Sequence, residues 1–157
     1  MNTLKRLSAA ALLAAVSAPL ALAAHTHVTT PSTWAINLKE SNFGTGPSSK
    51  SDTFTVTTDT DKWLEYSEVA VDSDGNTLKT SWSGPQDGSL RPIVGLSGGQ
   101  ASFDTAADTT VQMFPDGSKM SCGYSLPADK KKYIEKCVIT FQDGKTTKQT
   151  LVYDRIK

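Results

Sequence analysis

Short runs in which apolar and polar residues alternate fill most of this chain from residue 32 onward. In the first run, Trp34, Ile36 and Leu38 alternate with small or polar residues, as in a strand with one buried face. Asp-Gly pairs, which favour tight hairpin turns, separate several of the later runs. Three of them are Asp74-Gly75, Asp116-Gly117 and Asp143-Gly144. The pattern predicts antiparallel sheet.

The whole pattern amounts to about ten short strands with turns at the spacing seen in all-β barrels and sandwiches. No stretch after the N-terminal region shows a long helical period. The expected strands cover residues 32–38, 51–58, 62–71, 76–83, 90–94, 101–104, 109–114, 119–126, 132–141 and 146–155. A barrel and a sandwich both remain open on this pattern alone.

The N-terminal region resembles a secretory signal. Lys5 and Arg6 precede an apolar run at residues 7–22, and Ala21-Leu22-Ala23 forms a small-x-small cleavage site. The run is shorter than the roughly 20 residues of a membrane span, and we expect a periplasmic or secreted protein. The expected parts are a removed signal peptide at 1–23, a flexible segment at 24–31 and one β-barrel domain at 32–157.

Charge narrows the range of partners. Removal of residues 1–23 takes away Lys5 and Arg6 and leaves 14 basic against 16 acidic side chains. Nucleic-acid and anionic-membrane surfaces need a clustered basic excess. We therefore expect neither a nucleic-acid partner nor an anionic-membrane surface. The shortness of the apolar run predicts no membrane span, whereas a small apolar molecule or a protein partner remains possible.

Cys122 and Cys137 are the two cysteines of the chain. An even number of cysteines in an exported protein indicates a disulfide. Both residues share a face with apolar neighbours on adjacent expected strands, so we predict a bridge between strands on the core side.

Three short motifs stand near the two ends and in the centre of the chain. They are Thr33-Trp34-x-Ile36-Asn37-Leu38 with Ser41-x-Phe43-Gly44-x-Gly46-Pro47, Val71-Asp72-x-Asp74-Gly75, and Leu151-Val152-Tyr153-Asp154-Arg155. Together they resemble stretches of small exported bacterial proteins with a lipocalin-like β-barrel. The resemblance covers nearly the whole expected mature chain and implies an antiparallel up-and-down lipocalin-like barrel of about eight to ten strands. It also implies binding of a ligand, without implying a reaction.

In lipocalins, a Gly-x-Trp motif on the first strand is covered by a later Arg that closes the bottom of the barrel. The resemblance assigns these structural roles to Trp34 and Arg155, with Ser32 in place of the glycine. A cation over an indole face would itself stabilise by about 0.5–2 kcal/mol.

His25-Thr26-His27 contains both histidines. Cleavage after Ala24 would make His25 the N-terminus, and its amine, two amides and the His27 imidazole would then suit Cu(II) or Ni(II). Cleavage after Ala23 fits the small-x-small pattern better, and we favour a tail without metal. No other cofactor is expected.

Catalysis has little support in the sequence. No histidine follows residue 27 to activate a serine, and the cysteines are assigned to a disulfide. Carboxylates that could pair are Glu65, Glu68, Asp104, Asp108 and Glu135. Acidic residues on strands usually lie on the solvated face, so we expect these to be solvated and the protein not to be an enzyme.

Aromatic residues are spread over most of the expected strands. An eight-stranded barrel is just wide enough to be filled by side chains or to hold one small ligand, and both possibilities stay open. The predicted ligand-lining residues are Trp63, Trp82, Phe103, Met113 and Tyr124. We expect a non-enzymatic binder of a small apolar or amphipathic ligand. The alternative is a protein-interaction module, such as an inhibitor of an exported enzyme, that uses the loop at 44–49 or the N-terminal segment.

Overall fold

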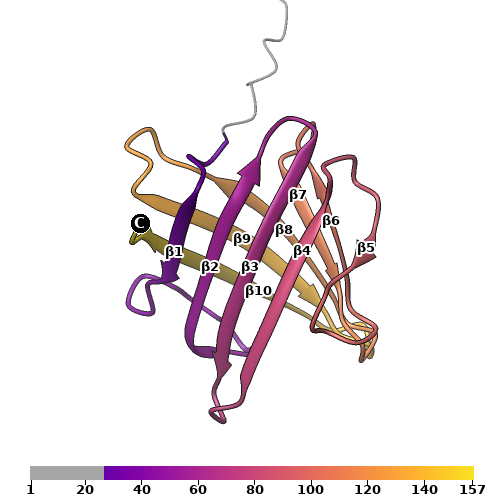
Figure 1. Cartoon of the computed structure of the whole chain (residues 1–157). Helices are drawn as coiled ribbons and strands as arrows, with labels where there is room; N and C mark the ends of the chain where they lie inside the picture. Colours follow the sequence, from indigo (N-terminus) through magenta and orange to yellow (C-terminus); the bar gives the residue numbers. More distant parts are fainter. Residues whose placement is uncertain (1–26) are drawn as a thin grey trace, which may run out of the picture.

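The protein folds into a single rolled sheet (Figure 1). The computed structural model describes residues 27–157, so the expected signal peptide lies outside the described part. All ten strands are antiparallel, which confirms the predicted β-barrel. The strands are β1 (Ser32–Ile36), β2 (Ser49–Asp59), β3 (Trp63–Asp72), β4 (Thr77–Pro85), β5 (Arg91–Pro92), β6 (Gln100–Asp104), β7 (Thr109–Met113), β8 (Lys119–Ser125), β9 (Lys132–Thr140) and β10 (Thr146–Arg155).

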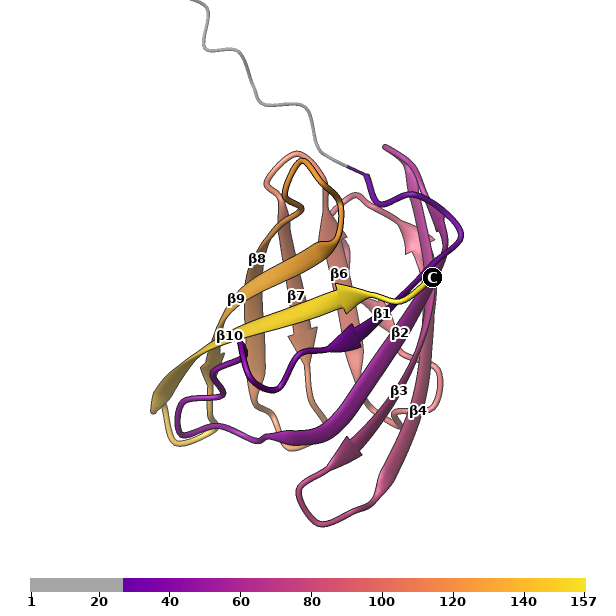
Figure 2. The ribbon, with the colours of Figure 1, turned by 90° about the vertical axis from the view of Figure 1, so that its left-hand side faces the viewer.

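The barrel closes first through the two ends of the folded chain. β1 pairs with both β2 and β10, so the sheet runs from β4 through β1 and β10 to β5. Figure 2 shows β1 and β10 side by side on the wall. The remaining seam lies between β4 and β5, where Ser81 and Val94 exchange backbone hydrogen bonds of 3.0 and 2.9 Å. The barrel is therefore nearly closed.

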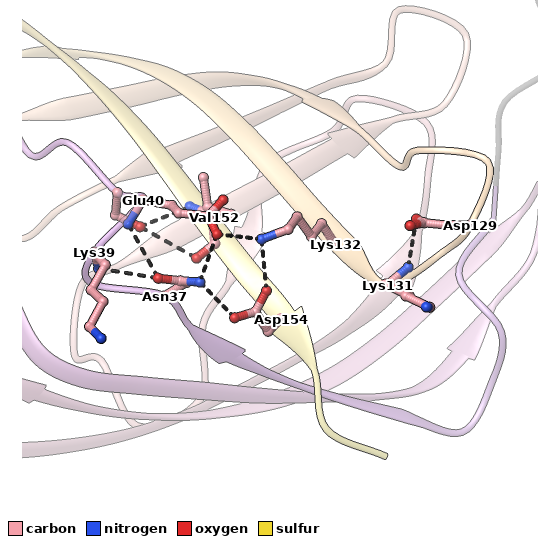
Figure 3. A network of polar contacts seen from close by, with 9 residues as sticks. Asn37, Lys39, Glu40, Asp129, Lys131, Lys132, Val152 and Asp154 are labelled. Carbon is pink, nitrogen blue, oxygen red and sulfur yellow. Dashed lines mark hydrogen bonds and ion pairs between the residues drawn. The ribbon is translucent and has the colours of Figure 1, made fainter.

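Polar side chains reinforce the β1–β10 seam from outside (Figure 3). Asn37 Nδ2 donates to Asp154 Oδ2 at 2.7 Å, and Lys132 Nζ lies 3.2 Å from Asp154 Oδ1. Lys132 Nζ also lies 2.6 Å from Glu40 Oε1. These groups are largely exposed, so each pair contributes little stability, but together they connect the loop after β1 to β9 and β10.

Asp-Gly turns form the hairpins as predicted. At the β3–β4 turn, the Asp72 carboxylate accepts hydrogen bonds from the backbone amides of Asp74 and Asn76 at 2.9 and 2.8 Å. Gly75 takes a φ of 93°, which a residue with a Cβ rarely adopts. The turn chemistry therefore follows directly from the local sequence.

One end of the barrel is sealed by the first strand. The Trp34 side chain is fully buried, and its indole N–H donates to Ser32 Oγ at 2.9 Å. Its ring packs against Phe54 and Tyr133, with centroid distances of 6.3 and 6.0 Å. Arg155 is the register partner of Trp34 on β10. Ser32 thus satisfies the indole N–H of the buried tryptophan.

The predicted disulfide is confirmed. Cys122 on β8 and Cys137 on β9 are direct register partners, and a disulfide joins them. Both are 2% exposed and belong to the apolar core. A disulfide of this kind is compatible with export.

Candidate functional site

The barrel encloses a cavity of about 600 Å³. This volume lies within the range of small-molecule sites. Every second residue of a strand faces inward, so the lining alternates along the chain. The aromatic part of the lining consists of Phe43, Phe54, Tyr66, Phe103, Phe114, Tyr124, Tyr133 and Tyr153. Side chains therefore do not fill the barrel, and space for a ligand remains.

The mouth lies at the end opposite Trp34. Pro47 and Ser48 from the β1–β2 loop line the cavity and are also exposed to solvent. Residues 76–78 of the β3–β4 hairpin also line the cavity and are exposed to solvent. Figure 2 shows the turn of this hairpin between β3 and β4. Exposed lining residues gather on these two segments, so a ligand would enter between them.

The loop at 44–49 is fixed to β10. The Gln149 amide donates to the carbonyls of Phe43 and Pro47 at 3.1 and 3.0 Å. A Cβ on Gly44 would lie 2.5 Å from the Lys148 carbonyl oxygen, so only glycine allows this close approach. The loop is therefore a fixed rim of the mouth.

The N-terminal segment covers the end of the cavity that lies away from the mouth. Val28 lines the cavity, and its amide donates to Asp59 Oδ2 at 2.8 Å. His27 Nδ1 lies 2.9 Å from Asp59 Oδ1, and its Nε2 lies 2.7 Å from Asp61 Oδ1. Buried Gln86 also donates to Asp59 Oδ1, at 3.1 Å. These contacts fix residues 27 and 28 against the end of β2.

Three carboxyl groups project into the middle of the cavity. Asp52 on β2, Glu68 on β3 and Glu135 on β9 all line it. The Tyr153 hydroxyl donates to Asp52 Oδ2 at 2.9 Å, and the Thr80 hydroxyl donates to Glu68 Oε2 at 3.2 Å. The site thus combines an aromatic wall with buried acids.

Burial shifts the titration of these acids. Desolvation, with a further effect of the Asp52 charge, raises the pKa of Glu68 to about 8, against the hydrogen bond from Thr80. Desolvation raises the pKa of Glu135 to about 7, against a hydrogen bond with Tyr133. It also raises the pKa of Asp52, against the bond from Tyr153. Burial in the cavity therefore favours the protonated form of these acids.

The five predicted lining residues occupy different places. Phe103 and Tyr124 line the cavity. Trp82 is 1% exposed and packs behind Phe103 at a centroid distance of 4.6 Å. Trp63 and Met113 lie on the outer face, because their neighbours Leu64 and Gln112 take the inward positions. Successive residues of a strand face opposite sides of the sheet, and this alternation, rather than aromatic character, decides which residues line the cavity.

The expectation that Glu68 and Glu135 are solvated is wrong. Glu68 is two residues away from both Tyr66 and Ala70, which face inward, and Glu135 is two residues away from inward-facing Tyr133. Each acid therefore lies on the inward face of its strand. Asp52, which sequence reasoning missed, likewise precedes inward-facing Phe54 by two residues. This shared alternation was the signal available in the sequence, whereas Glu65 on the opposite parity of β3 is exposed as expected.

The predicted histidine metal site falls partly outside the described residues, because His25 precedes them. His27 is described, and both of its ring nitrogens lie against carboxylates. Cys122, Glu135 and Cys137 bring potential ligand atoms within 4.8 Å of one another. The two sulfur atoms are already joined to each other, so this group is a disulfide beside an acid.

No family model matches the chain, and no curated protein matches its sequence. Within residues 27–157, no helix has the length and apolar character needed to cross a membrane.

Proposed function

We propose that this protein is a periplasmic or secreted, non-enzymatic binding protein that holds a small apolar or amphipathic ligand inside its barrel. The observation that carries the proposal is the cavity of about 600 Å³, with aromatic walls and a mouth between two rim segments. Specific ligand sites usually combine an apolar concave surface with a few polar groups. The resemblance to exported lipocalin-like proteins agrees with this function.

The cavity contents argue for binding rather than for covalent catalysis. The lining contains no histidine or free thiol among the described residues. Its serines and threonines therefore have no imidazole beside them to act as a base. The proposal predicts that a bound ligand leaves the barrel chemically unchanged.

Native mass spectrometry tests this function. Protein purified from the organism that produces it should carry a small molecule, and the mass of that molecule should not change on incubation with fresh protein. A protein without any bound molecule, which also fails to take one up from an extract of the same organism, would contradict the proposal. Conversion of the molecule into a product would indicate an enzyme.

A matched pair of variants places the ligand. Ala70 lines the cavity from β3, whereas Val69 on the same strand points outward and is 42% exposed. Ala70→Trp should fill part of the cavity and abolish ligand retention. Val69→Trp adds a similar volume outside and should retain the ligand. Equal retention by both variants would show that the ligand does not occupy the barrel.

A further inference from the structure

The cavity is acidic without a compensating base. Among the described residues, its lining includes five carboxyl side chains and no lysine, arginine or histidine. The acids are Asp52, Asp59, Glu68, Asp72 and Glu135. Asp59 is engaged by His27 at the sealed end, and Asp72 caps the β3–β4 turn at the mouth. Three acids therefore remain for the centre of the cavity.

One of these acids is short of a hydrogen-bond donor. Asp52 is only 7% exposed, and its Oδ2 accepts the bond from Tyr153. Its Oδ1 is buried and accepts no hydrogen bond from a permanent donor; among the described residues, the other group within hydrogen-bonding reach of this carboxyl is Glu68, which can donate only while it is protonated. A buried carboxylate oxygen without a donor is costly. A donor on a bound molecule would remove that cost.

Aromatic rings surround the acids. Phe54 lies 4.9 Å from Tyr153 and 5.5 Å from Tyr133, measured between ring centroids. Tyr153 holds Asp52, and Tyr133 is hydrogen-bonded to Glu135. Aromatic faces attract organic cations, with quaternary ammonium groups as a well-known example. The acids and the rings thus favour the same kind of ligand.

A single metal ion fits this arrangement poorly. In the described part of the chain, the one group of potential ligands that converges within 4.8 Å contains the two bridged cysteines with Glu135. Asp52 and Glu68 do not join Glu135 in such a group. Asp52 and Glu68 lie within hydrogen-bonding reach of each other, and Glu135 does not converge with them on one point, which suits the larger head of an organic cation.

We propose that the ligand of this barrel is an organic cation, an amine or quaternary ammonium group with an apolar body, whose head is held by Asp52, Glu68 and Glu135. This inference rests on the proposed binding function. The apolar body would lie along the aromatic wall, and an N–H or polarised methyl group of the head would approach Asp52 Oδ1.

Binding of the cation releases protons. Glu68 is within hydrogen-bonding reach of Asp52 and can donate to it only while protonated. A cation takes the place of that proton, which then leaves to solvent. The titratable groups that face Glu68 from the surrounding strands are Asp52, Tyr66, Glu135 and Tyr153. The tyrosines stay neutral because burial raises their pKa values, so the released protons come from the carboxyl groups.

Calorimetry with three probes that share one body tests the inference. The probes are phenylbutyltrimethylammonium, phenylbutanol and phenylbutyrate, which differ in head charge. At about pH 8, we expect the cation to bind at least about tenfold more tightly than the alcohol, and the anion to bind most weakly. Equal binding of all three would overturn the cation inference and leave the proposed function intact. Absence of binding by all three would contradict the proposed function itself.

The pH dependence adds a second readout. The quaternary ammonium does not titrate, so a rise in its affinity between about pH 6 and about pH 9 must come from the protein. Titrations in buffers with different ionisation enthalpies should show proton release for the cation and none for the alcohol. An affinity for the cation that does not change with pH would overturn the inference.

Variants assign the effect to the acids. Glu68→Gln and Asp52→Asn should each lower the affinity for the cation by about tenfold or more and leave the affinity for the alcohol unchanged. Glu65→Gln, on the outer face of the same strand as Glu68, is the control and should change neither. Circular dichroism identifies any variant that fails to fold. If one of the two acid variants does not fold, the affinity of the other one tests the inference. A cation preference that survives in both variants would overturn the inference.

Discussion

The sealed end of the barrel and its central cavity bury polar groups in opposite ways. At the sealed end, the Trp34 indole is fully buried and its N–H is satisfied by Ser32. In the cavity, Asp52 is almost as deeply buried, and among the described residues one of its oxygens accepts no hydrogen bond from a permanent donor. An unsatisfied buried atom costs stability. The comparison indicates that the sealed end maintains the fold. In the cavity, the poorly satisfied Asp52 oxygen lowers stability, and a ligand that donates to it would restore that stability.

The two regions are in contact, so the difference between them is local. Phe54 packs against Trp34 on one side and against Tyr153 on the other. Tyr153 in turn holds Asp52. Because both regions pack on Phe54, substitutions on its two sides are close enough to influence each other's effect.

Trp34→Ala should cause the largest effect. Removal of a fully buried tryptophan leaves a cavity at the sealed end, and we expect a loss of about 3–5 kcal/mol in the free energy of unfolding. Urea denaturation measures this loss. Trp63→Ala, at a site that is 44% exposed, is the matched control and should cost less than about 1 kcal/mol. Similar losses for both variants would show that Trp34 does not close the barrel.

The cavity should reverse the usual effect of pH on stability. Glu68 has a pKa of about 8 in the folded protein against 4.5 ordinarily. The folded state then keeps a proton that the unfolded chain loses, so stability falls as the pH rises from about 5 to about 8. For one such group the slope is about 1.4 kcal/mol per pH unit. Denaturation across this range should show a steeper fall for the wild type than for Glu68→Gln.

The control for this slope lies on the same strand. Glu65→Gln changes an exposed carboxylate and should keep the wild-type slope. If Glu68→Gln and the wild type have parallel pH profiles, Glu68 is ionised in the folded protein over the whole range. The cavity would then hold a permanent negative charge instead of an exchangeable proton.

Ser32→Ala should cause a smaller loss at the sealed end. It removes the acceptor of the Trp34 indole N–H and leaves that donor buried. The expected cost is about 1–3 kcal/mol in the free energy of unfolding, measured by urea denaturation. Ser67→Ala on exposed β3 surface should stay within about 0.5 kcal/mol of the wild type. A neutral Ser32→Ala variant would show that the indole finds another acceptor.

The smallest effect concerns the N-terminal segment. Burial alone would lower the pKa of His27, but hydrogen bonds and charges of Asp59 and Asp61 raise it above 6.5 overall. Its ion pairs therefore stabilise the segment below about pH 6.5 and are lost as the pH rises through the folded pKa. The protection factor of the Val28 amide, which corrects the exchange rate for the intrinsic effect of pH, should fall over that range by the equivalent of less than about 1 kcal/mol. A His27→Gln variant should lack this pH dependence.

Much of the wall of this barrel was predictable. Asp-Gly turns and alternating runs depend on local chemistry, so all ten strands appear near their expected positions. The cysteine pair was also predictable, because Cys122 and Cys137 share an apolar face on neighbouring strands. Lining residues were harder to predict. Trp63 is aromatic but faces solvent, whereas Glu135 is acidic but faces the cavity.

By itself, the sequence determined the strands, their turns, the disulfide and the inward position of Trp34, since each depends on neighbours along the chain or on one hydrophobic face. Only the tertiary structure decided that the interior holds a cavity and that Asp52, Glu68 and Glu135 meet inside it. These acids come from β2, β3 and β9, and their approach depends on how β1 joins β2 to β10. Packing and desolvation arise between strands that are far apart in sequence, so they become visible only when the sheet closes.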